Sequence, residues 1–129
     1  MPPRIEIGID CADPVALAPF WAAALGYEVG DLDADGIYLD LVPPRAGMTI
    51  VYLQRVPEPK VTKNRAHLDL YDPDPEAAVE RLERLGATKV GEPRTGSEGG
   101  WWQVMLDPEG NELCVCREDE PAASGPASS

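Results

Sequence analysis

The residues best suited to chemistry in this chain are its single histidine, His67, and a glutamate, Glu6, at the matching place of an internal repeat. Imidazole and carboxylate groups bind divalent metals, and a histidine beside a carboxylate is also a general acid or base. Equivalent positions of two repeats can meet across a pseudo-twofold axis, so the pair is a candidate site. A catalytic zinc ion usually needs three protein ligands, and two residues do not complete one.

The repeat is visible in two helix signatures. Asp13-Pro14 begins one apolar stretch that ends at Gly26, and Asp74-Pro75 begins another that ends at Gly86. Aspartate suits the N-cap, proline the first helical turn and glycine the C-terminal end of a helix. One strand-like segment precedes each helix and three follow it. The pattern therefore predicts two βαβββ modules.

We expect one α+β domain over residues 1–117, with modules at about 4–56 and 64–117 and helices on the convex side of a curved, eight-stranded mixed sheet. Residues 118–129 are rich in Ala, Ser, Pro and Gly and are predicted to form a disordered tail. The predicted strands are residues 4–11, 27–30, 36–42, 48–55, 65–71, 87–90, 101–106 and 112–117.

Alternation along the strands predicts a polar face that points away from the helices. In residues 101–106 we assign Trp101 and Gln103 to that face and Trp102 to the core. Such a face is either only exposed to solvent or the lining of a ligand cavity. The candidate pocket residues are Glu6, Tyr38, Asp40, Gln54, His67, Asp69, Trp101, Gln103 and Cys114, with Asp10, Tyr52 and Tyr71 on the same face.

The composition excludes several classes of protein. The 129 residues suit a single domain, and the net charge of −12 disfavours nucleic acid as a partner. No apolar run approaches the roughly 18 residues that a membrane helix needs. An N-terminus without an apolar signal region and an odd number of cysteines, three, favour a cytoplasmic protein with free thiols.

Several motifs together resemble the vicinal oxygen chelate (glyoxalase/bleomycin resistance/dioxygenase) superfamily, and within it the small glyoxalase-like domains. The resemblance covers about residues 4–117, and the turn before the last strand is its most specific part. The motifs are Ile9-Asp10-Cys11-Ala12-Asp13-Pro14, Phe20-Trp21, Leu25-Gly26, Asn64-Arg65-Ala66-His67-Leu68-Asp69-Leu70, Leu82-Glu83-Arg84-Leu85-Gly86-Ala87 and Asp107-Pro108-Glu109-Gly110-Asn111-Glu112-Leu113.

This resemblance implies where a metal would bind. Metal-dependent members take one ligand from each of four strands, and these positions fall on Glu6, Gln54, His67 and Cys114. Cys114 departs from the usual glutamate, although a thiolate can bind zinc. We therefore expect no tightly bound catalytic metal, and a divalent metal remains the alternative.

Three hypotheses for function follow. The first is a small-molecule-binding protein of the bleomycin-resistance type, with no known ligand, whose acidic and aromatic side chains suit a cation or a flat ring. Its alternative is a metal-dependent lyase, isomerase or dioxygenase with Glu6 and His67 as metal ligands. The third is a metal-free enzyme in which Glu6 or Asp69 orients His67 as acid or base. The resemblance also implies a homodimer.

Overall fold

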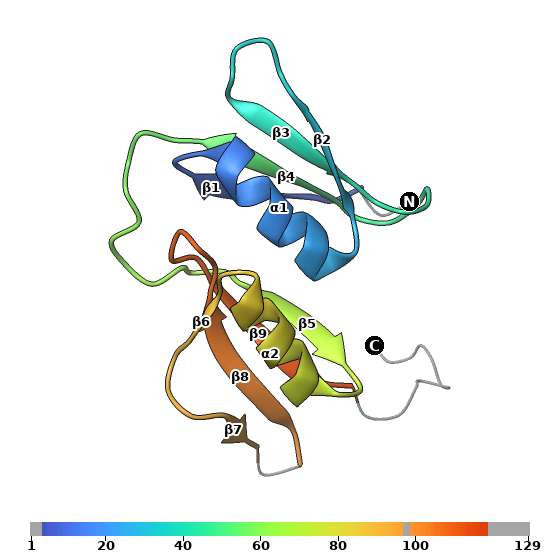
Figure 1. The fold of residues 1–129 in the computed structure, drawn as a ribbon, viewed down its shortest axis with the longest axis vertical. Coiled ribbons are helices and arrows are strands. Elements are labelled where there is room, and N and C mark those ends of the chain that lie inside the picture. Colours follow the sequence, from blue (N-terminus) through green and yellow to red (C-terminus); the bar gives the residue numbers. More distant parts are fainter. Residues whose placement is uncertain (1–3, 97–98, 119–129) are drawn as a thin grey trace. The chain divides into compact units, whose positions relative to one another are not determined.

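The computed structural model describes residues 4–96 and 99–118, which fall into two units divided between Thr62 and Lys63 (Figure 1). Apart from Glu118, the predicted tail lies outside the described residues. No helix in the described ranges is long and apolar enough to cross a membrane.

The first module contains β1 (Glu6–Cys11), α1 (Pro14–Leu25), β2 (Glu28–Leu32), β3 (Tyr38–Val42) and β4 (Ile50–Arg55). Its four strands are ordered β1-β4-β3-β2, with β1 parallel to β4 and the other pairs antiparallel. Helix α1 lies across one face of this sheet (Figure 1).

The second module contains β5 (Leu68–Asp72), α2 (Pro75–Arg84), β6 (Thr88–Lys89), β7 (Arg94–Thr95), β8 (Trp101–Leu106) and β9 (Glu112–Arg117). The main order is β5-β9-β8-β6, and β7 pairs with β8. The α+β class and the two repeated modules are confirmed, but the strands form one four-stranded and one five-stranded sheet in place of the single eight-stranded sheet that was expected. The two-residue strand β7 was not predicted, because two residues are too few to show alternation.

The predicted capping residues begin both helices. The Asp13 carboxylate accepts a hydrogen bond from the Ala16 amide at 3.2 Å, and the Asp74 carboxylate accepts one from the Ala77 amide at 3.3 Å. Gly26 ends α1 in the left-handed region, with φ of 75°, where glycine carries no steric penalty. These caps fix where each helix begins above its sheet.

Each module buries its own apolar layer between helix and sheet. In the first module Trp21 of α1 is buried, as are Leu39 and Leu53 of the sheet. In the second module Leu82 of α2 and Leu113 of β9 are buried. Because strand residues alternate between faces, this layer leaves the opposite face of each sheet to polar and aromatic side chains.

Candidate functional site

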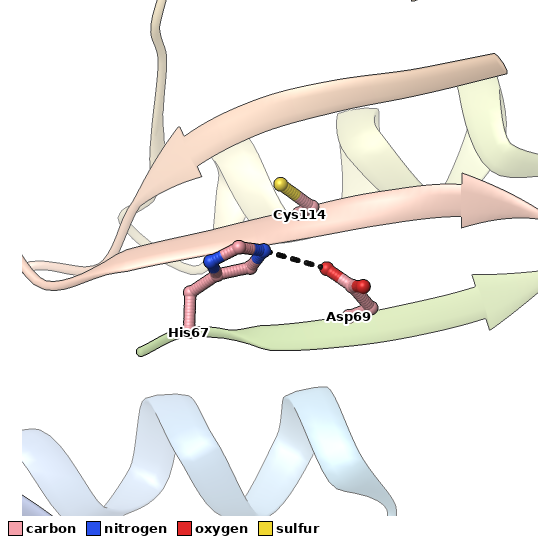
Figure 2. A group of neighbouring side chains, drawn as sticks. All are labelled: His67, Asp69 and Cys114. Atoms are coloured by element: carbon pink, nitrogen blue, oxygen red, sulfur yellow. Dashed lines mark ion pairs between the residues drawn. The ribbon is translucent and has the colours of Figure 1, made fainter. Parts of the chain in front are cut away.

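Three chemically active side chains meet in the second module (Figure 2). His67 lies immediately before β5, Asp69 lies within β5, and Cys114 lies on the neighbouring strand β9. Asp69 and Cys114 are direct partners in the parallel pairing of the two strands. His67, two residues before Asp69, points to the same side. One ligand atom from each residue lies within 4.8 Å of the others.

The exposure of the three side chains differs. The Nε2 atom of His67 and Oδ1 of Asp69 are 3.1 Å apart, and the two side chains are 39% and 43% exposed. Cys114 is only 8% exposed. The cluster therefore has an imidazole–carboxylate pair open to solvent and a thiol beneath it.

Burial raises the pKa of the Cys114 thiol, and the carboxylate of Asp69 adds to this effect, whereas the positive charges of Lys63 and Arg94 oppose it. Burial also raises the pKa of Cys116 to about 11. A thiol with a raised pKa is protonated at neutral pH and is a poor nucleophile. This arrangement therefore does not favour catalysis by a thiolate of Cys114 or Cys116.

An aromatic pair occupies the polar face of the first module. The ring of Tyr52 lies directly against the backbone of Gly8, because a Cβ atom at Gly8 would be 2.5 Å from its Cζ atom. Tyr38 meets Tyr52 edge to face, with ring centroids 6.0 Å apart.

The register places Asp40 opposite Tyr52 on β3 and β4, and Asp10 opposite Gln54 on β1 and β4. Tyr38, Asp10 and Asp40 are exposed, and Gln54 is half-buried, so the predicted polar face of this module is confirmed.

Glu6, the predicted partner of His67, forms an ion pair with Arg4 and lies opposite Ile50 in the sheet. The repeat also aligns differently from the sequence-based expectation. Asp13 and Asp74 cap the two helices, and Gly8 and Asp69 occupy equivalent positions before these caps. Gly8 lies opposite Tyr52 in the sheet and Asp69 lies opposite Cys114, so the counterpart of Cys114 is Tyr52. Gln54, two residues further, has Cys116 as its counterpart.

The face assignment in β8 was wrong. Gln103 is 1% exposed and pairs with the buried Val115, so it lies on the helix side and not on the polar face. Trp102 pairs with Cys116 and is on the polar face. Trp101 points the other way, with the guanidinium carbon of Arg117 5.8 Å from its ring centroid. Every residue around Gln103 is apolar, so hydropathy alone could not set the phase.

The buried amide of Gln103 has a structural role instead. Its Nε2 atom donates to the carbonyl oxygens of Val90, Gly91 and Val104 at 3.0–3.3 Å. Replacing Gln103 by leucine keeps the volume and removes these bonds. We expect the free energy of unfolding in urea to fall by about 1–3 kcal/mol. The matched change Gln54→Leu on the polar face should alter it by less than about 0.5 kcal/mol; equal losses would contradict this role.

Sequence reasoning did not identify the role of Gly8 or the place of Trp102. It gave Asp69 as a pocket residue and as a carboxylate that orients His67, but not as a neighbour of Cys114. The signal for Asp69 was present, since a residue two positions after His67 shares its face. Its proximity to Cys114 depends on the register between β5 and β9, which no local pattern encodes.

Comparison with known proteins identifies the fold family. The family model of the glyoxalase-like domain matches residues 6–116. A glyoxalase/bleomycin resistance protein/dioxygenase superfamily member from Sphaerobacter thermophilus is 22% identical, with a TM-score of 0.69, over 92% of this chain and 98% of that one. A glyoxalase-related enzyme from Fulvimarina pelagi is 15% identical, with a TM-score of 0.71, over 100% and 99%.

Lactoylglutathione lyase from Agrobacterium tumefaciens is also similar in structure, at 18% identity and a TM-score of 0.61, over 90% of this chain and 95% of that one. No curated protein matches the sequence. At these identities the solved structures establish the fold and not the activity. The family model covers most of the chain, and the chain therefore belongs to the glyoxalase-like domain family.

Proposed function

We propose that this protein binds small organic molecules, with a preference for aromatic cations, and that it does so without the four-ligand metal set of its superfamily. The observation that carries the proposal is the ring of Tyr52, held against Gly8 and next to Tyr38 on the polar face of the first module. The absence of a side chain at Gly8 lets the Tyr52 ring lie against the sheet, which fixes an aromatic surface on this face.

The physical basis is cation–π attraction combined with charge. An aromatic ring attracts a cation above its face by about 0.5–2 kcal/mol, more when the cation is desolvated. Tyr52 is already packed against Gly8, so little conformational entropy is lost when a ligand arrives. The carboxylates of Asp10 and Asp40 lie on the same face of the sheet. The net charge of −12 also draws cations toward the protein.

Of the remaining predicted pocket residues, Glu6 and Gln54 add polar groups to this face of the first module. His67, Asp69 and Cys114 lie in the second module, and cation binding at Tyr52 does not require them. Gln103 is not included, because its amide is buried and bonded on the helix side. Trp102 replaces Trp101 as the tryptophan on the polar face.

The test uses benzyltrimethylammonium, titrated into the full chain by calorimetry. Replacing Tyr52 by leucine should weaken binding by about 3–30-fold, which is the loss of one cation–π contact. Gly8→Ala should act in the same direction, because the new methyl group must displace the Tyr52 ring.

Gly100→Ala is the matched control for Gly8→Ala. Among the described residues, no heavy atom lies within 4 Å of a Cβ at Gly100, and the φ of Gly100 lies outside the positive range. This variant should bind the probe within about twofold of the unchanged protein, because nothing at the proposed site moves. If the unchanged protein shows no binding, or if Tyr52→Leu binds equally well, the proposal is wrong.

A metal-dependent lyase, isomerase or dioxygenase is the second candidate function, and the cluster around His67 favours it. Glu6 and His67 are suitable ligand types, but the set does not fit the family chemistry well. Glu6 is paired with Arg4, and Cys114 stands where a carboxylate would move a proton. We therefore derive no catalytic step from a metal held by these four residues.

We also propose that the protein is a cytoplasmic homodimer. Strand β2 is an edge strand of its sheet, and edges with free backbone groups favour pairing. Light scattering should give roughly twice the chain mass of 13.9 kDa. A mass equal to one chain would contradict the dimer.

A further inference from the structure

The donors for a metal ion are already gathered within the second module alone. His67 offers a ring nitrogen, Asp69 offers a carboxylate oxygen and Cys114 offers Sγ, all within 4.8 Å of one another. Around tetrahedral zinc, neighbouring ligand atoms are about 3.3–3.6 Å apart, given metal bonds of about 2.0 Å to nitrogen or oxygen and 2.3 Å to sulfur. The 3.1 Å between His67 and Asp69 is already close to this spacing. Small side-chain rotations therefore suffice to enclose an ion.

The backbone holds this arrangement. Asp69 and Cys114 are partners in adjacent parallel strands, so their side chains rise from the sheet side by side. Cys114 comes from the segment directly after the turn that Asp107 stabilises, and β9 lies between β5 and β8 in the sheet. Donors on regular, paired strands are better fixed than donors on loops, which applies to Asp69 and Cys114, and His67 directly precedes β5.

The chemistry of the donors selects the ion. One nitrogen, one oxygen and one sulfur suit zinc or cobalt, whereas magnesium and calcium prefer oxygen alone. Three protein ligands leave a fourth position for water or for a group of a bound molecule, as in open zinc sites. The thiol would bind as thiolate, and its proton would pass to solvent.

The family pattern places the other ligands on the first module, and this chain departs from that pattern. Glu6 is engaged by Arg4, and Gln54 corresponds to Cys116 instead of Cys114. Asp69 has no acidic counterpart, because Gly8 occupies the equivalent position in the first module. The asymmetry puts one complete set of three donors in one module.

We propose that the second module alone binds a divalent transition metal ion, zinc in preference to magnesium or calcium, through His67, Asp69 and Cys114. Glu6 and Gln54 take no part in this site. The inference goes beyond cation binding at Tyr52 and does not depend on it, since the two sets of residues lie on different modules.

The experiment titrates the full chain with cobalt chloride under reducing conditions. Cobalt bound by a thiolate produces a charge-transfer absorption in the near ultraviolet, so the spectrum reports sulfur ligation directly. We expect one equivalent to bind, the band to disappear on adding zinc, and the band to persist in excess magnesium. The absence of binding, or binding without the band, would overturn the proposal.

The variants locate the site. His67→Ala should lower the affinity for zinc, measured by competition with cobalt, by at least tenfold. Asp69→Asn should lower this affinity by a similar factor. Cys114→Ser should abolish the band, whereas Cys116→Ser and Cys11→Ser should keep it. Since Cys114 is buried, its variant is checked for folding by circular dichroism, and exposed His67 provides an independent test.

Two variants separate this site from one shared by both modules. Glu6→Gln and Gln54→Ala should leave the zinc affinity within about twofold of the unchanged protein. A loss in these variants equal to that of His67→Ala would overturn the proposal in favour of the four-ligand set. Tyr52→Leu should not change cobalt binding, so failure of the cation proposal and failure of this one are distinguishable.

Discussion

Replacing Asp107 by alanine is expected to lower the free energy of unfolding by about 3–5 kcal/mol. The side chain is 3% exposed, and its carboxylate accepts hydrogen bonds from the amides of Glu109 and Asn111 at 2.8 and 2.9 Å. It also accepts one from Nδ2 of Asn111 at 3.1 Å. Hydrogen bonds to a charged group contribute about 1.5–3 kcal/mol each, and losing the acceptor leaves buried donors unpaired.

Thermal unfolding measures this effect, and a loss of this size lowers the melting temperature by about 10–20 °C in a domain of this length. Asp107→Asn should cost less than alanine, because it keeps one acceptor oxygen for the two backbone amides. Glu80→Ala, on the exposed side of α2, should change the stability by less than about 0.5 kcal/mol. An Asp107→Ala protein as stable as the Glu80 variant would show that the turn before β9 does not depend on this carboxylate.

Zinc is expected to stabilise the protein through His67, Asp69 and Cys114. A ligand that binds only the folded state adds about 2.7 kcal/mol when its free concentration is one hundred times its dissociation constant. The predicted gain should appear as a higher midpoint in urea for the unchanged protein. Removal of zinc by a chelator should reverse it.

The same gain should vanish in His67→Ala and remain in Glu6→Gln, because only the first of these variants loses a proposed ligand. His67 is the better residue to change, since its side chain is 39% exposed and its removal leaves no buried cavity. If zinc raises the stability of His67→Ala by the same amount, the ion does not bind at this cluster.

The sequence predicts the fold well because its signals are local. Asp13-Pro14 with Gly26, and Asp74-Pro75 with Gly86, mark the helices, and alternation marks the strands of the first module. Local signals fail at β8, where tryptophan, valine, leucine and methionine are equally apolar on both faces. There the phase is set by pairing with β9 and by the carbonyls that accept from Gln103.

The candidate site is less predictable because it depends on register. That Asp69 lies beside Cys114, and Tyr52 over Gly8, follows from how the first and last long strands of each module align. Counting along the repeat makes Gln54 the counterpart of Cys114, whereas in the observed alignment the counterpart is Tyr52, two residues away along the same strand. Both residues lie on the same face of the sheet, but they have different neighbours on the adjacent strands. A metal or ligand site depends on those neighbours.

The central claim is that the polar face around Tyr52 binds an organic cation. Titrating the isotopically labelled full chain with benzyltrimethylammonium and following its backbone amide resonances tests it most directly. We predict saturable shifts that gather at the facing positions of β1, β3 and β4, near Gly8, Asp40 and Tyr52. Shifts confined to β5 and β9, or no saturable shift at all, would contradict the claim.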